Sequence, residues 1–121
     1  DRGWLHRRIE RRLHHMVEQG FIGEMQQLRR NPLTHSQLPA MRSVGYRQAW
    51  NHLDALSLDG GDFAAGNDSI WMDKAVAATR QLAKRQLTWL RNMRNVNVIA
   101  CDTLSLAAQQ ESVLSRLRTL A

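Results

Sequence analysis

The sequence predicts a mostly helical chain with one short strand. Apolar residues recur three or four positions apart in five segments of the 121-residue sequence, and this is the spacing of amphipathic helices. β-branched residues alternate in one place, the segment VNVIA at residues 96–100, which is typical of a strand. A chain of this length can form a single domain with a modest core.

The helix boundaries follow from local signals. By residue number, the expected helices are about 1–19, 21–30, 43–56, 69–92 and 105–119. Gly20 is the expected stop of the first helix, and Pro32 ends the second because the residue before a proline disfavours helix. The third helix is expected to start near Ser43 or Gly45, and Asp68 or Ser69 to cap the fourth.

Two features suggest that the chain is a fragment of a larger protein. It does not begin with Met, and a lone strand at 96–100 requires pairing partners that the chain does not supply. Residues 57–67 (SLDGGDFAAGN) are rich in Gly and Asp and are expected to form a flexible connection.

The charge distribution favours an anionic partner. Lys and Arg number 17 against 11 Asp and Glu, a net charge of +6. No acid occurs between Glu24 and Asp54 or between Asp73 and Asp102. Nucleic acid, an acidic membrane surface and small phosphates all remain compatible with this charge. No apolar run is long enough to span a membrane, no secretory signal is recognisable, and the single Cys101, expected in the core, is compatible with a cytoplasmic protein.

Two basic segments are the candidate binding sites. At about 100° per residue, Arg80, Lys84, Arg91 and Arg94 share one strip of a helix; Leu82, Leu87, Trp89 and Leu90 are expected in its core, with Leu82, Trp89 and Met93 on the far side. The strip is either a solvated face or an anion-binding surface, and the absence of acids favours the second interpretation.

The segment at residues 42–47 (RSVGYR) places Ser43, Gly45 and Tyr46 at an expected helix start. Free N–H groups there favour phosphate, and Tyr46 could stack on a base; a capped helix with a half-buried Tyr46 is the plainer alternative. The five His residues and the single Cys make no metal-ligand pattern, and we expect no catalytic centre within the chain.

Four motifs resemble the C-terminal part of the tRNA dimethylallyltransferase (tRNA isopentenyltransferase) family. They are DRxxLxxRIExR at residues 1–12, MxxxGFxxEM at 16–25, RSVGYRQAW at 42–50 and ATRQLAKRQLTWLR at 78–91. The resemblance implies a parent with a P-loop, nucleotide-kinase-like α/β fold and a helical insertion. It implies transfer of a dimethylallyl group from dimethylallyl diphosphate to N6 of the adenine 3′ to the tRNA anticodon.

The resemblance also implies the site. The tRNA-contacting residues would be Arg42, Ser43, Val44, Gly45, Tyr46, Arg47, Lys84, Arg85, Gln86, Leu87, Thr88, Trp89, Leu90 and Arg91, and the partner would be the anticodon stem-loop. The ATP-binding-type phosphate loop, the Mg²⁺ site and most of the dimethylallyl diphosphate site would precede Asp1, so the chain alone is expected to be inactive. The segment SLDGGDFAAGNDS is longer than the usual family connection. A stand-alone helical nucleic-acid-binding module is the alternative function.

Overall fold

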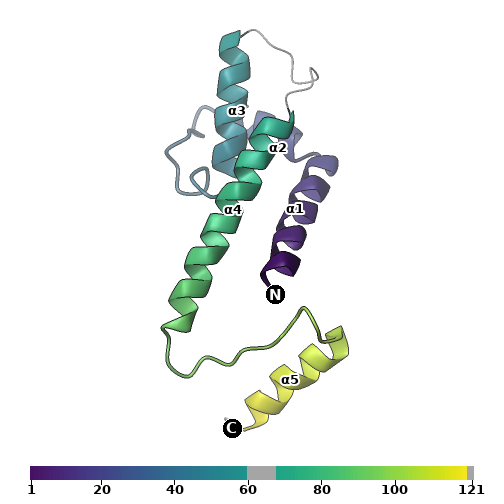
Figure 1. Ribbon diagram of the computed structural model, residues 1–121. Coiled ribbons are helices and arrows are strands. Elements are labelled where there is room, and N and C mark those ends of the chain that lie inside the picture. The colour runs from purple at the N-terminus through teal and green to yellow at the C-terminus, as the bar shows by residue number, and fades with distance from the viewer. Residues whose placement is uncertain (60–67, 120–121) are drawn as a thin grey trace.

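The computed structural model describes residues 1–59 and 68–119. Its helices are α1 (Arg2–Glu18), α2 (Phe21–Arg30), α3 (Tyr46–Asp59), α4 (Asp68–Arg91) and α5 (Leu106–Arg118). The prediction of a mostly helical chain is confirmed, and α1 to α4 form one bundle from which α5 stands apart (Figure 1). Of the predicted flexible connection, residues 57–59 belong to α3 and residues 60–67 lie outside the described part of the chain.

Caps and glycines set the helix boundaries. The Asp1 carboxylate accepts a hydrogen bond of 2.6 Å from the backbone N–H of Trp4 and so caps α1. Gly20 has a φ of 94°, which only glycine adopts without strain, and this lets the chain turn directly from α1 into α2. Gly45 has a φ of 95°, so α3 begins after it, at Tyr46, and not at Ser43.

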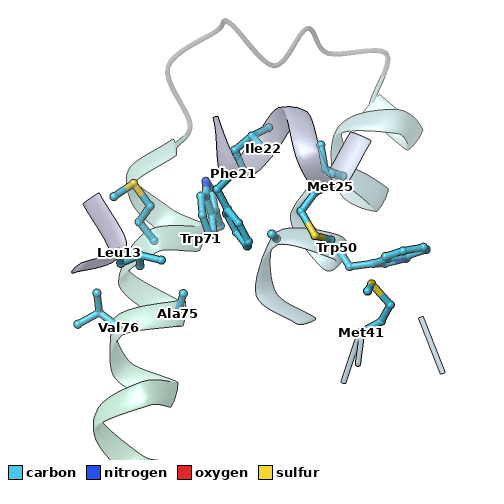
Figure 2. Packing of buried hydrophobic residues seen from close by; sticks show 12 residues of the cluster. Leu13, Phe21, Ile22, Met25, Met41, Trp50, Trp71, Ala75 and Val76 are labelled. Atoms are coloured by element: carbon cyan, nitrogen blue, oxygen red, sulfur yellow. The ribbon is translucent and has the colours of Figure 1, made fainter. Parts of the chain in front are cut away.

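Twelve buried apolar side chains from all four bundled helices and the loop before α3 form the core. They are Leu13, Phe21, Ile22, Met25, Met41, Ala49, Trp50, Leu53, Trp71, Met72, Ala75 and Val76. Figure 2 shows Leu13 of α1 beside Val76 and Ala75 of α4, and Trp71 beside Phe21. Helix α4 packs against both α1 and α3, and α2 packs against the same two helices.

Trp71 is the centre of a row of aromatic rings that crosses the bundle. Its side chain is 2% exposed and stacks on Phe21 of α2 at 6.2 Å and on His52 of α3 at 6.0 Å, both between ring centroids. Phe21 in turn meets the ring of Tyr46 edge-on at 5.3 Å. These contacts join α2, α3 and α4 and continue to the first residue of α3.

The predicted strand at residues 96–100 is wrong. In the described residues this segment has no regular secondary structure and pairs with no strand, and Val96 and Val98 are 40% and 77% exposed. An extended segment becomes a strand only when a neighbour takes up its backbone N–H and C=O groups, and the described part of this chain offers no such neighbour. Cys101, expected in the core, is exposed, because α5 covers this segment only in part and no other described helix packs on α5.

Helix α5 is attached to the extended segment and packs against no other described helix. Gln109 donates hydrogen bonds from its Nε2 to the carbonyl oxygens of Leu104, at 2.8 Å, and Cys101, at 3.3 Å. Arg116 donates to the Oδ1 of Asn97 at 2.5 Å. The apolar side of α5 is exposed at Leu106, Val113, Leu114 and Leu117. Among the described helices, none is long and apolar enough to cross a membrane.

Removing core volume at Met25 should destabilise the bundle. Met25 is fully buried, so Met25→Ala should lower the free energy of unfolding by about 2–5 kcal/mol. A urea titration followed by the helical circular dichroism signal measures this loss. Leu33→Ala is the control, because Leu33 is 80% exposed and its truncation should change stability by less than about 0.5 kcal/mol. Equal losses for the two variants would contradict this packing.

Candidate nucleic-acid interface

The residues at 42–47 lie in a turn that is fastened on several sides. Ser43 does not cap α3; its hydroxyl donates to the carbonyl oxygen of Ala40 at 2.6 Å. The backbone N–H of Gly45 instead donates to the Oε1 of Gln48 at 2.8 Å. The Arg47 guanidinium donates to the carbonyl oxygen of Arg42 at 2.7 Å, which closes the turn. The free N–H groups expected here are therefore partly satisfied within the chain.

Tyr46 fastens this turn to α2. Its ring is half-buried against Phe21, and its hydroxyl donates to the Oε1 of Glu24 at 2.6 Å. The hydrogen bond to Glu24, followed by burial and the negative charge of Glu24, raises the pKa of Tyr46 above its ordinary value of 10.0. Tyr46 is thus held in a single orientation while one side of it faces a groove.

That groove, here named the tyrosine groove, lies between α1, α4 and the turn before α3. Its volume is about 570 Å³. Its lining includes Arg8, Arg12, Ser43, Tyr46, Leu82 and Gln86. Of the sequence-predicted site residues, the tyrosine groove contains Ser43, Val44, Gly45, Tyr46 and Gln86. The fold therefore brings the two basic segments together here, although they are about forty positions apart in the sequence.

A second groove follows the other side of the contact between α1 and α4. This cationic groove has a volume of about 200 Å³, and its charged or titratable lining residues are Arg2, His6, Arg80, Lys84 and Arg91. Leu5 and Ala83 line both grooves and so form the ridge between them. Of the predicted site residues, the cationic groove contains Lys84, Leu87, Thr88 and Arg91.

The remaining predicted site residues lie outside these two grooves. Arg42 and Arg47 line a separate hollow of about 300 Å³, which also includes Asp54. Arg85, Trp89 and Leu90 are exposed on α4, with Trp89 at 64% and Leu90 at 40%. Leu82 and Leu87 are only partly buried. The prediction that Leu82, Leu87, Trp89 and Leu90 are core residues is therefore wrong for the described chain.

The cationic strip itself needs one correction. Helix α4 ends at Arg91, so Arg94 lies beyond the helix in a turn and does not extend the strip. Arg80 is paired: its guanidinium donates to the Oε2 of Glu10 at 3.1 Å. Sequence reasoning assigned no particular arginine of the first helix to a site; in the structure Arg8 and Arg12 of α1 face the tyrosine groove, and Arg2 and His6 face the cationic groove. Their position beside α4 depends on helix packing and has no local signal.

A helical bundle whose two grooves are lined by cations and by no described acid is typical of a protein that binds phosphate groups. The family model described as IPP transferase matches residues 1–93, which is most of the sequence and includes both basic segments. The chain belongs to the IPP transferase family.

Curated relatives agree with this membership. The chain is 48% identical over 126 residues to a tRNA dimethylallyltransferase from Verminephrobacter eiseniae, with 97% of this chain and 37% of that protein aligned. It is 48% identical over 109 residues to one from Acidovorax sp., with 90% and 31% aligned. It is 46% identical over 103 residues to one from Francisella tularensis, with 84% and 30% aligned. The chain thus spans about a third of the length of these relatives.

Solved structures show the same arrangement. The tRNA delta(2)-isopentenylpyrophosphate transferase from Staphylococcus epidermidis superposes with a TM-score of 0.78 at 26% identity, over 100% of this chain and 36% of that one. The full-length tRNA isopentenylpyrophosphate transferase from Bacillus halodurans superposes with a TM-score of 0.71 at 26% identity, over 96% and 35%.

Gly45 should resist substitution because of its backbone alone. No atom lies within 4 Å of a Cβ built at Gly45, but its φ is positive. Gly45→Ala should therefore cost about 1–2 kcal/mol of stability. Gly23 has equal space but lies within helix α2, so Gly23→Ala should stabilise by up to about 1 kcal/mol. Chemical denaturation of both variants measures these opposite shifts; a neutral Gly45→Ala would contradict the backbone argument.

The hydrogen bond from Tyr46 to Glu24 should give stability a dependence on high pH. Tyr46→Phe should cost about 0.5–1.5 kcal/mol at pH 7. Folding raises the pKa of Tyr46, so this contribution is present below the ordinary pKa of 10.0 and is lost as the pH rises through the raised value. Unfolding titrations of both proteins between pH 8 and pH 11 should show the difference shrinking above about pH 10. A constant difference would exclude the linkage.

Proposed function

We propose that this chain is the tRNA-binding C-terminal part of a tRNA dimethylallyltransferase. The observation that carries the proposal is the pair of grooves on either side of the α1–α4 contact, which gather cations from these two helices and, in one groove, bring them beside the turn at 43–46. Membership of the family and the names of the relatives supply the substrate class. No observation on the chain favours the stand-alone module over this assignment.

The proposed reaction is attack by the exocyclic N6 of the adenine next to the anticodon on the allylic carbon of dimethylallyl diphosphate. The N6–C bond forms as the C–O bond to diphosphate breaks, and N6 loses a proton. The adenine must leave the stack of the anticodon loop to reach that carbon. The chain's part is to hold the stem-loop by its phosphates, which fixes the orientation of the adenine.

The tyrosine groove and the cationic groove suit different parts of the tRNA. Tyr46 offers an aromatic edge and Gln86 an amide beside Arg8 and Arg12, a combination that suits an unpaired nucleotide of the loop. Lys84 and Arg91 in the cationic groove offer mainly positive charge, which suits backbone phosphates.

The chemistry of diphosphate departure is assigned to the remainder of the protein. Among the described residues, no group of three or more His, Cys, Asp or Glu side chains could hold a metal ion. The described part of the chain therefore does not fit the Mg²⁺ that the family implies, and we place the Mg²⁺ site, the phosphate loop and the base for N6 outside it. The isolated chain should be inactive, and the whole enzyme should work in the cytoplasm, where tRNA is found.

The exposed apolar side chains support the proposal that the chain packs against further protein. Trp89, Leu90 and Met93 at the end of α4 are 64%, 40% and 44% exposed. The apolar side of α5 is exposed as well. Contiguous apolar surface of this kind usually marks an interface, and the P-loop domain of the parent enzyme is the partner that we propose for it.

Charge removal on α4 should affect tRNA and spare the prenyl donor. In the full-length enzyme, the triple change of Lys84, Arg85 and Arg91 to Gln should raise the KM for tRNA about tenfold or more, because each cation contributes a phosphate contact. The KM for dimethylallyl diphosphate should stay within about twofold. Steady-state kinetics with each substrate varied in turn separates the two effects.

Lys74→Gln is the matched control, because Lys74 is an exposed cation on the same helix that lines none of the grooves described above. Its kinetics should equal those of the unmodified enzyme. An unchanged KM for tRNA in the triple variant would remove α4 from the proposed interface.

A further inference from the structure

The geometry points to a subsite for one phosphate group in the cationic groove, formed by Arg2, Arg80, Lys84 and Arg91. Arg2 and Arg80 lie outside the two segments to which the family resemblance assigned tRNA contacts. This inference rests on the proposed function and extends it, because it says where a phosphate group is held and by which additional residues.

The charge around the cationic groove is of one sign. Every charged residue that lines it is a cation, and His6 is its other titratable group. The outer face of α1 differs, since Arg7 and Arg11 there alternate with Glu10 and Glu18. Mixed charge is what a solvated helix normally carries, so the one-sided charge in the groove is specific to that location.

Most of the cations in this groove have no carboxylate partner in the described chain. Among the described residues, no ion pair involves Arg2, Lys84 or Arg91, although acids are available elsewhere on α1. Arg80 alone has a described carboxylate partner, Glu10, at 3.1 Å. Like charges that share one groove repel each other, and a bound anion relieves that repulsion.

The groove is also small. The groove measures about 200 Å³, below the range of about 300–1,000 Å³ usual for pockets that enclose a drug-sized ligand. Leu5, Ala83 and Leu87 contribute apolar surface to the lining of the groove. This surface lowers the local dielectric constant and strengthens charge interactions. A single phosphate group fits within this volume and matches the charge.

Glu10 gives the subsite a distinctive signature. Its carboxylate competes with the phosphate for Arg80, so Glu10→Gln should strengthen anion binding by about two- to threefold, while Arg80→Gln and Arg2→Gln should each weaken it by about three- to tenfold. A role of Arg80 that is only structural predicts no gain of binding from Glu10→Gln.

The experiment uses the full-length protein that carries this chain. Dissociation constants for tRNA are measured across a series of KCl concentrations, and inhibition constants are measured for inorganic pyrophosphate. Arg7→Gln, on the outer face of α1, is the control and should change neither. If the phosphate belongs to the RNA backbone, the Arg2 and Arg80 variants should weaken tRNA binding and reduce its salt slope by about one contact each. The proposed function predicts this outcome. Weakened inhibition by pyrophosphate would instead assign the phosphate group to the diphosphate of the prenyl donor, and would contradict the expectation that charge removal on α4 spares that substrate.

Unchanged constants for both probes in the Arg2 and Arg80 variants would overturn the subsite. The subsite would also be overturned if the Glu10→Gln variant bound these anions no more tightly than the unmodified protein does. If the triple α4 variant still loses tRNA affinity in that case, only the subsite fails. If the unmodified protein shows no salt-dependent binding of tRNA at all, the proposed function itself fails.

Discussion

The burial of Trp71 is the constraint on which the arrangement of this chain depends. Its indole lies between Phe21 of α2 and His52 of α3, and it brings α4 with it into the core. Phe21 continues the row to Tyr46. One row of rings therefore sets the position of the turn at 42–47 relative to α4, so the two basic segments keep a fixed geometry. A buried indole of this size contributes several kcal/mol, which exceeds the repulsion among partly exposed cations.

Helix packing then turns two sequence segments into surfaces with different chemistry. The contact between α1 and α4 leaves a groove on each side, and Leu5 and Ala83 separate them. Aromatic and amide groups lie on one side, and charge predominates on the other. The glycine at position 45 allows the turn to enter the first groove. A recognition surface for RNA generally needs both kinds of contact, one for bases and one for phosphates.

Much of the helical fold could be predicted from the sequence, because apolar periodicity and capping residues are local. Asp1 at the start of α1 and Gly20 between α1 and α2 act as their types suggest. Helix α3 begins one residue after Gly45, the later of its two expected starts, because the positive φ of Gly45 keeps that residue out of the helix. Val96–Ala100 and Trp89 mislead for a common reason: an apolar or β-branched pattern does not show whether a neighbour packs against it, and the described chain supplies none that buries them. The grooves could not be predicted, because Arg2 and Arg8 reach them only through the packing of α1 on α4.

The uneven support of α4 has a mechanical consequence. The helix is buried around Trp71–Val76, whereas no residue from Lys84 to Arg91 is buried. At 1.5 Å per residue, its basic end lies about 30 Å from Trp71. Beyond the core, α4 is supported on one side by the start of α1, and a tilt of about 10° about Trp71 would displace its far end by about 5 Å. A small change of packing around this one tryptophan would therefore shift the basic end by about the spacing between neighbouring nucleotides.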